Sequence, residues 1–250
     1  IPQATAEDLE RAVRRAESAF ASWKDRAPTD RGAILRRFAD LLRQNESMIA
    51  RWITLDEGKP LGEALVEVRS SADHVDWHAE ECRRIYGRIV PSRNPTVQHL
   101  VVREPVGVCL AITPWNFPLS QAVRKVAAAL ASGCTMILKG PTEAPAGCLV
   151  IARFLQEAGL PEGCLNLVWG NSSFISETLI AHPVVRKITF TGSVEVGKHL
   201  AALAGQHMKR ATMELGGHAP VLVFDDADAG AAARALAGNK LRNAGQVCIS

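Results

Sequence analysis

Apolar side chains recur every three or four residues in the first third of the chain, which is the spacing of one helix face. Thr5 can cap the first of these helices, and Pro-Thr-Asp at residues 28–30 separates it from the second. A third helix over residues 61–84 is richer in charge, so we expect it at the surface. The inward positions of the first two helices are Leu9, Val13, Ala16, Phe20, Trp23, Ile34, Leu35, Phe38, Leu41 and Leu42.

After Gly87 the pattern changes to short β-rich runs, first at residues 97–102 and 106–112, with prolines in the turns that join them. From there on, strand patterns alternate with helix patterns. This alternation predicts an α/β fold with a mainly parallel, doubly wound sheet and helices on both faces. The predicted strands are residues 108–112, 134–138, 165–168, 187–190 and 221–224, and the predicted helices are residues 120–131, 146–158, 173–180 and 196–203.

The composition of the 250-residue chain is that of a globular protein, with 47% hydrophobic and 22% charged residues. The formal net charge is +3 and the two signs are interspersed, so no segment is typical of a nucleic-acid-binding or membrane-surface tail. Prolines and polar residues interrupt the longest uncharged run, residues 105–123, and the N-terminal residues do not resemble a signal peptide. We therefore expect a cytoplasmic protein that binds neither nucleic acid nor membrane.

The six cysteines form no C-x-x-C pair, which favours a reduced protein over a disulfide framework. His74, His78 and Cys82 recur every four residues and share one helix face, as metal ligands can. A fourth ligand at matching spacing is missing, and the segment also fits a solvated helix face. The sequence therefore predicts no metal site.

Polar residues follow the predicted strands, at the sheet edge where such folds bind ligands. Asn116 lies in a proline-rich loop and offers an amide donor just before a helix. Lys139 ends a strand, where it suits a ribose or phosphate group. Taken alone, each also fits a plain structural role.

Residues 192–198 have the spacing G-x-x-x-x-G-K and nearly match a phosphate-binding P-loop. The next residue is His199, whereas a P-loop needs a Ser or Thr hydroxyl there for Mg²⁺, so the segment does not predict an NTPase. Gly192 still permits close approach of the backbone to an anion such as pyrophosphate at a helix N-terminus. The dinucleotide fingerprint G-x-G-x-x-G is absent from the chain.

Two residues are candidates for covalent and acid–base chemistry. Glu214 precedes Gly216 and Gly217, and a glutamate in apolar surroundings can serve as a general base. Cys248 follows a polar loop, where a cysteine can be an activated nucleophile. Either residue, considered alone, fits a structural role as well.

Four segments gain weight when they are taken together: residues 114–118 (Pro-Trp-Asn-Phe-Pro), 190–193 (Phe-Thr-Gly-Ser), 214–217 (Glu-Leu-Gly-Gly) and 245–248 (Gly-Gln-Val-Cys). In this order and spacing, across essentially the whole chain, they resemble the aldehyde dehydrogenase superfamily. The chain is most similar to the succinate-semialdehyde dehydrogenase branch, because residues 71–77, 224–228 and 242–246 also resemble sequence segments typical of that branch.

The resemblance implies a role for each motif residue. Cys248 would be the nucleophile, Glu214 the general base, and Asn116 an oxyanion-hole donor together with the backbone N–H of Cys248. The implied reaction is the NAD- or NADP-dependent oxidation of an aldehyde to the acid through a Cys248 thioester. The implied cofactor-binding residues are Thr113, Trp115, Asn116, Lys139, Thr142, Gly192, Ser193 and Leu215.

Two arginines stand at positions similar to the carboxylate-binding arginines of that branch. Arg124 lies on the helix after the Asn116 loop, and Arg242 precedes Cys248 by six residues. Two guanidinium groups can clamp a terminal carboxylate, which favours a semialdehyde such as succinate semialdehyde. A dehydrogenase for uncharged aldehydes is the alternative. Thr142 stands where NAD-preferring relatives often carry a glutamate, so NADP should be accepted.

The resemblance also divides the chain into parts. Residues 1–84 and 105–215 would form a Rossmann-like dinucleotide-binding domain, and residues 85–104 a β-hairpin arm of the oligomerisation type. Residues 216–250 would begin a catalytic domain that is incomplete here, because the family's chain continues beyond its cysteine. We expect a homo-oligomer when the chain is full length; an inactive dinucleotide-binding fragment is the alternative. Gly140 and Ser176 depart from the family's usual proline and glycine.

Overall fold

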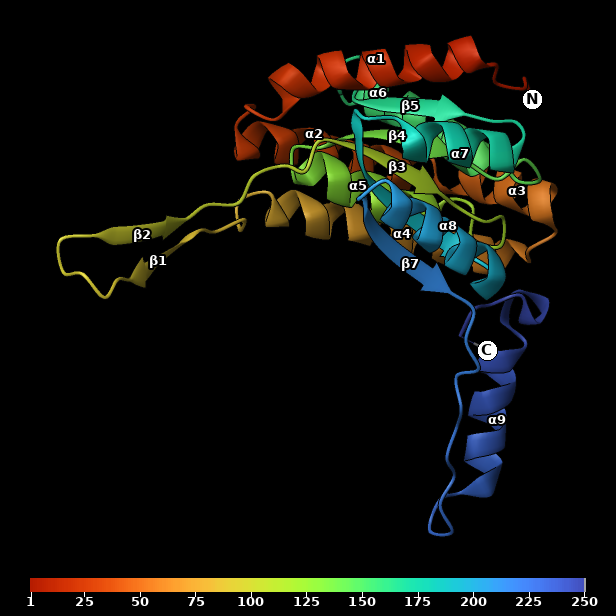
Figure 1. Ribbon diagram of the computed structural model, residues 1–250. Coiled ribbons are helices and arrows are strands. Elements are labelled where there is room, and N and C mark those ends of the chain that lie inside the picture. The colour runs from red at the N-terminus through yellow and green to blue at the C-terminus, as the bar shows by residue number, and fades with distance from the viewer. Residues whose placement is uncertain (250) are drawn as a thin grey trace.

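The computed structural model describes residues 1–249 and contains one central parallel sheet with helices on both faces (Figure 1). The strand order is β5-β4-β3-β6-β7, so the chain first builds outward from β3 in one direction and then in the other. The predicted α/β, doubly wound fold is therefore confirmed. The strands are β3 (Val108–Ile112), β4 (Thr135–Lys139), β5 (Leu165–Val168), β6 (Val185–Gly192) and β7 (Arg210–Leu215).

Two hydrophobic clusters hold the layers together, one on each face of the sheet. Because side chains alternate along a strand, Cys109 and Ala111 of β3 enter one cluster while Val108 and Leu110 enter the other. The first cluster is covered mainly by α2 (Pro28–Gln44), α3 (Glu46–Glu57), α4 (Leu61–Glu81), α5 (Ser120–Ala131) and α6 (Ala146–Glu157), and the second by α1 (Ala6–Trp23), α7 (Ser172–Ala181) and α8 (Val194–Gln206).

Helix α1 forms where the sequence predicts it, and its start is capped. The Thr5 hydroxyl accepts the N–H of Asp8 at 3.2 Å, while the Asp8 carboxylate accepts the N–H of Thr5 at 2.9 Å. This reciprocal pair satisfies two backbone donors that a helix start leaves open. The prediction for the third helix is only half right, because α4 is exposed on one face and buries Val68, Ala72 and other residues against its neighbours on the other.

The predicted strand at residues 221–224 is wrong. These residues form no strand, and the side chains of Leu222 and Phe224 are 81% and 71% exposed. The sheet edge is taken instead by β7, which pairs with β6 from Lys187 and Arg210 onward and which the sequence did not indicate. The apolar run has no neighbouring strand among the described residues, so hydrophobicity alone does not make it part of the sheet.

Two parts leave the body of the molecule (Figure 1). Strands β1 (Arg88–Pro91) and β2 (Gln98–Val101) form an antiparallel hairpin that projects to one side, within the predicted arm. At the other end, residues 216–228 lead irregularly into α9 (Ala229–Lys240) and the short 3₁₀ helix η1 (Arg242–Gly245). Among the described residues, no helix has the length and apolarity needed to cross a membrane.

All six cysteines are free; five are buried and Cys248 is exposed. In residues 1–249 no three or more His, Cys, Asp or Glu side chains gather as metal ligands would, the helical series of His74, His78 and Cys82 included.

Candidate active site

The carboxyl ends of β3, β4 and β6 lie side by side, because both β4 and β6 pair with β3. After β3 the chain continues to β4 on one side of this strand, and it later returns to form β6 on the other side. Doubly wound sheets bind ligands at such a switch in strand order. Lys139 ends β4 with 8% of its surface exposed, and burial lowers the pKa of its ammonium while Glu143 opposes that shift. The predicted strand-end lysine is therefore enclosed rather than solvated.

The end of β6 offers a second set of polar groups. The Thr191 hydroxyl is buried without a hydrogen-bond partner among the described residues. Ser193 caps α8, because its hydroxyl accepts the N–H of Val196 at 3.3 Å. A Cβ on Gly192 would lie 2.4 Å from the ring of Phe190, so a side chain there would force the ring to move. An unpartnered hydroxyl beside a helix N-terminus fits the phosphate and ribose groups of a dinucleotide.

The remaining cofactor candidates lie along the same edge. Thr113 follows β3 and is buried, whereas Trp115 is 36% exposed in the same loop. Thr142 is exposed in the loop after β4. Leu215 ends β7 and packs toward α8, where its Cδ2 lies 2.4 Å from the position of a Cβ on Gly197. The structure thus brings the predicted cofactor residues to one edge of the sheet.

Gly140, the departure from the family's usual proline, lies against a buried thiol. A Cβ at this position would lie 2.6 Å from Cys148 Sγ and 3.3 Å from the indole nitrogen of Trp169. The cysteine therefore fills the space that a side chain at position 140 would need.

Cys248 lies in an exposed turn directly after a strained segment. Asn243, Ala244 and Gly245 have φ values of 48°, 54° and 78°, in the left-handed region that non-glycine residues rarely adopt. The carbonyl oxygen of Cys248 accepts the N–H of Gly217 at 3.2 Å. The segment that follows Glu214 is thereby held against the candidate nucleophile.

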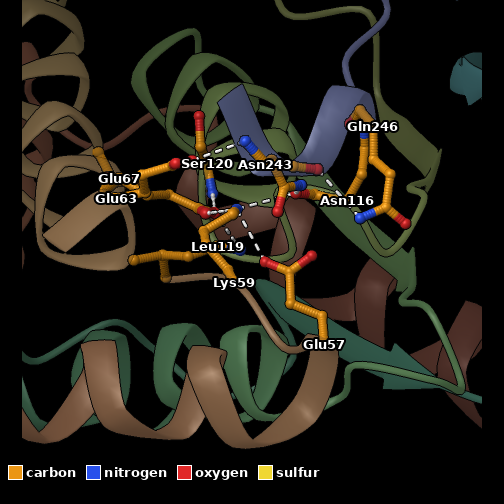
Figure 2. A network of polar contacts seen from close by, with 10 residues as sticks. Glu57, Lys59, Glu63, Glu67, Asn116, Leu119, Ser120, Asn243 and Gln246 are labelled. Carbon is orange, nitrogen blue, oxygen red and sulfur yellow. Dashed lines mark hydrogen bonds and ion pairs between the residues drawn. The ribbon is translucent and has the colours of Figure 1, made fainter. Parts of the chain in front are cut away.

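Asn116 joins the same assembly from the β3 side (Figure 2). Its side-chain Nδ2 donates to the backbone carbonyl of Gln246 at 2.9 Å, two residues before Cys248. One amide hydrogen is used in this contact, and the second is left for a ligand. The structure therefore brings together three of the predicted motifs, those of Asn116, Gly217 and Cys248.

Glu214 does not have the apolar surroundings that the sequence suggested. It is exposed near the end of β7, because β7 is the edge strand of the sheet and the residues that follow turn away from the body. It faces a cation that the sequence analysis missed. Lys125 on α5 donates to the Thr189 hydroxyl at 2.9 Å, and burial lowers the pKa of its ammonium to about 8 against the opposing charge of Glu214.

The two arginines lie in different surroundings, and no contact between their guanidinium groups is found in the described part of the chain. The guanidinium carbon of Arg242 lies 5.4 Å from the centre of the Phe117 ring. Arg124 lines a hollow of about 500 Å³ between α4 and α5. The other lining residues are Ser70, Asp73, His74, Trp77 and His78.

A buried ionic cluster was also missed by sequence reasoning (Figure 2). Lys59 lies between Glu57 and Glu67, and none of these side chains is more than 2% exposed. A local signal was available, since Glu-Gly-Lys-Pro at residues 57–60 places a charged residue inside a tight Gly–Pro corner. We call Glu57, Lys59 and Glu67 the Lys59 cluster.

The profile of the aldehyde dehydrogenase family matches residues 1–250. The chain belongs to the aldehyde dehydrogenase family. It is 45% identical over 247 residues to a 4-(hydroxymethyl)benzenesulfonate dehydrogenase of Comamonas testosteroni, covering 99% of this chain and 52% of that protein. It is 39% identical over 249 residues to an NADP(+) succinate-semialdehyde dehydrogenase of Escherichia coli K12, covering 100% of this chain and 52% of the relative.

A solved structure of this family confirms the fold. A crystal structure of a succinate-semialdehyde dehydrogenase from Burkholderia pseudomallei superimposes with a TM-score of 0.97 at 41% sequence identity, covering 100% of this chain and 52% of that one. The chain thus spans about half the length of the aldehyde dehydrogenases it matches.

Proposed function

We propose that this chain carries the cofactor site and the nucleophile of an NAD(P)-dependent aldehyde dehydrogenase whose substrate bears an anionic group. The observation that carries the proposal is the hydrogen-bonded assembly of Asn116, Gln246, Cys248 and Gly217. It sets a thiol, an amide donor and the segment that follows Glu214 next to one another at the ligand-binding edge of the sheet.

In the proposed mechanism the Cys248 thiolate attacks the aldehyde carbonyl carbon and forms a tetrahedral thiohemiacetal. The free amide hydrogen of Asn116 and the backbone N–H of Cys248 stabilise the negative oxygen. Bound nicotinamide supplies the redox chemistry, since it accepts the hydride that leaves this carbon. Glu214 then takes a proton from water, which attacks the thioester, releases the acid and restores the Cys248 thiolate.

Polar residues at the carboxyl edge of the sheet support the proposed cofactor site. Lys139, Thr191 and Ser193 would hold ribose and phosphate oxygens, and Gly192 gives them close access to the backbone. Thr142 is neutral and exposed, so it does not repel a 2′-phosphate, and the similar Escherichia coli enzyme is named for NADP(+). We therefore propose that NADP is accepted as well as NAD.

The proposed substrate is a carboxylated semialdehyde such as succinate semialdehyde. Support comes from the hollow beside Arg124, whose guanidinium can bind an anion. The acidic residue of this hollow, Asp73, pairs with Arg43 at 2.9 Å, and Arg43 also pairs with Asp76 at 2.6 Å. Both relatives described above are named for compounds that carry an anionic group, a sulfonate or a carboxylate.

The test is formation of reduced nicotinamide by the intact enzyme with succinate semialdehyde and with butyraldehyde, which has the same carbon chain but no charge. We expect turnover with both cofactors, a higher kcat/KM for succinate semialdehyde, and no turnover by Cys248→Ser. Turnover that survives in Cys248→Ser would contradict the mechanism. A preference for butyraldehyde would contradict the substrate class.

A further inference from the structure

The ammonium of Lys59 is fully buried and has three oxygen atoms around it. Its side chain is 0% exposed, and Nζ contacts Glu57 Oε1 at 2.8 Å, Glu67 Oε2, and the backbone carbonyl of Asn116 at 2.8 Å. The ring of Phe117 lies against the same nitrogen, with its centre 3.8 Å away. Burial of a charge costs several kcal/mol unless partners of this kind surround it. Two of these contacts, Asn116 and Phe117, belong to the loop that carries the oxyanion donor.

Glu67 extends this contact to the start of α5. Its Oε1 accepts the backbone N–H of Leu119 at 3.1 Å and of Ser120 at 3.0 Å (Figure 2). These are donors that the first turn of a helix leaves open, and a carboxylate there also interacts favourably with the helix dipole. One carboxylate therefore joins the beginning of α5 to Lys59, and Lys59 joins both to the Asn116 carbonyl.

The Asn116 carbonyl is also bound from the side of the nucleophile. Asn243, 1% exposed, donates from Nδ2 to this oxygen at 2.9 Å, and its backbone N–H donates to Glu63 Oε2 at 2.7 Å. Asn243 begins the left-handed segment that leads to Cys248. Each non-glycine residue in such a conformation costs about 1–2 kcal/mol, so the segment persists because contacts outside it hold it in place.

From these contacts we infer that Lys59 is a positioning residue, which holds the Asn116 carbonyl so that the Asn116 amide and the loop of Cys248 keep the spacing needed to stabilise the oxyanion. The inference rests on the proposed function. Lys59 acts through Asn116 and does not touch the substrate. Its partners come from the end of α3, from α4 and from the loop after β3, and the Asn116 carbonyl that it binds also accepts from Asn243 of η1.

The test is a double-mutant cycle in the intact enzyme between Lys59→Met, which keeps the length of the side chain, and Asn116→Ala. Misplacement of a catalytic group by about 1 Å costs up to about 100-fold, so we expect Lys59→Met to lower kcat about 10- to 100-fold with little change in KM. In the Asn116→Ala background, Lys59→Met should lower kcat by less than about threefold, because the amide that Lys59 positions is gone. If the two substitutions instead lower kcat independently, so that their fold-losses multiply in the double variant, the inference is overturned.

Alkylation of Cys248 by iodoacetamide separates positioning from general damage. This reaction forms no oxyanion, so its rate should fall by less than about twofold in Lys59→Met. A parallel loss of alkylation and of turnover would indicate a merely structural role. Lys24→Met is the matched control, since the Lys24 ammonium also lies over a phenylalanine ring, 5.9 Å from Phe20, but at the surface. It should leave all rates unchanged.

If Lys59→Met does not fold, the double variant Lys59→Met/Glu67→Gln replaces it in the cycle, because it leaves no unpaired charge at Glu67. It should fold and remain slow in turnover while Cys248 is alkylated normally; full recovery of kcat would overturn the inference. Wild-type enzyme without aldehyde oxidation would instead refute the proposed function, so the two failures are distinguishable.

Discussion

Gly217 donates its backbone N–H to the carbonyl oxygen of Cys248 at 3.2 Å. This hydrogen bond links the two segments that carry the proposed general base and the proposed nucleophile. Glu214 is the next-to-last residue of an edge strand, and Cys248 follows a strained turn, so neither segment is fixed by its own secondary structure alone. The hydrogen bond between Gly217 and Cys248 therefore helps to keep the proposed base and the proposed nucleophile near each other.

Glu214→Gln should separate the two halves of the reaction. Glutamine keeps the size of the side chain but cannot take a proton from water, so acylation proceeds and hydrolysis of the thioester stalls. We expect a burst of about one reduced nicotinamide per site, followed by turnover slowed about 100-fold or more. Rapid-mixing absorbance measures both phases; normal steady-state turnover would refute the role of Glu214.

Arg124→Ala should weaken recognition of the anionic group only. Loss of a charge-assisted contact should lower kcat/KM for succinate semialdehyde about 10- to 100-fold and for butyraldehyde less than about threefold. Arg153→Ala is the control, because Arg153 is exposed on α6 away from this hollow. Equal losses for both aldehydes would show that Arg124 has no part in recognition of the anion.

Thr142→Glu should move the cofactor preference toward NAD. A carboxylate here accepts hydrogen bonds from ribose hydroxyls and repels a 2′-phosphate, whereas threonine does neither. We expect kcat/KM for NADP to fall about tenfold or more relative to that for NAD. Thr142→Val, which is similar in size and uncharged, is the control; an unchanged ratio in Thr142→Glu would place the 2′-position elsewhere.

The stability of the Lys59 cluster should depend on pH through Glu57. Burial raises the pKa of this carboxyl from 4.5 to about 7, with Lys59 opposing the shift. Between these values the folded protein holds a proton that the unfolded chain has released, so stability present at low pH is lost as pH rises through 7. Glu57→Gln does not titrate, and its gain in the free energy of unfolding over wild type should grow to about 1–2 kcal/mol at alkaline pH.

Urea unfolding of wild type and Glu57→Gln, under acidic and under mildly alkaline conditions, checks this sign. The two proteins should have nearly the same free energy of unfolding in acid, and Glu57→Gln should have the larger one under alkaline conditions. A difference of the same size under both conditions would mean that Glu57 does not bind a proton in the folded protein.

The β1–β2 arm is proposed to contact a second copy of the chain. Ile89 and Leu100 lie directly opposite each other on the hairpin and are 68% and 70% exposed. Ile89→Glu with Leu100→Lys removes this apolar pair but keeps a compatible cross-strand pair. Light scattering should then show a shift from oligomer to monomer; an unchanged mass would place the subunit contact elsewhere.

Much of the fold follows from local patterns, and the exceptions depend on distant pairing. Helix α1 is predictable because Thr5, Asp8 and its apolar stripe are all local. The choice between residues 221–224 and β7 for the sheet edge is not local, because it depends on pairing with β6. The weakly apolar segment of β7 forms the edge strand because Met213 and Leu215 pack against the core cluster on that face of the sheet.

The candidate site divides in the same way. The motifs of Asn116, Glu214 and Cys248 can be recognised in the sequence, but the contacts that arrange them cannot. The Glu-Gly-Lys-Pro corner at residues 57–60 marks Lys59 as unusual, but nothing local shows that it meets Asn116, 57 positions away. Charged residues in a sequence are usually solvated, so a buried lysine is recognised only from its surroundings.

The close fit of Gly140 against Cys148 restricts the path by which this chain can evolve. A side chain at position 140 would lie 2.6 Å from the sulfur, so a mutation there is harmful while the cysteine remains. A side chain at position 140 therefore needs the Cys148 sulfur to shift or to be absent. The effects of substitutions at positions 140 and 148 should accordingly depend on each other.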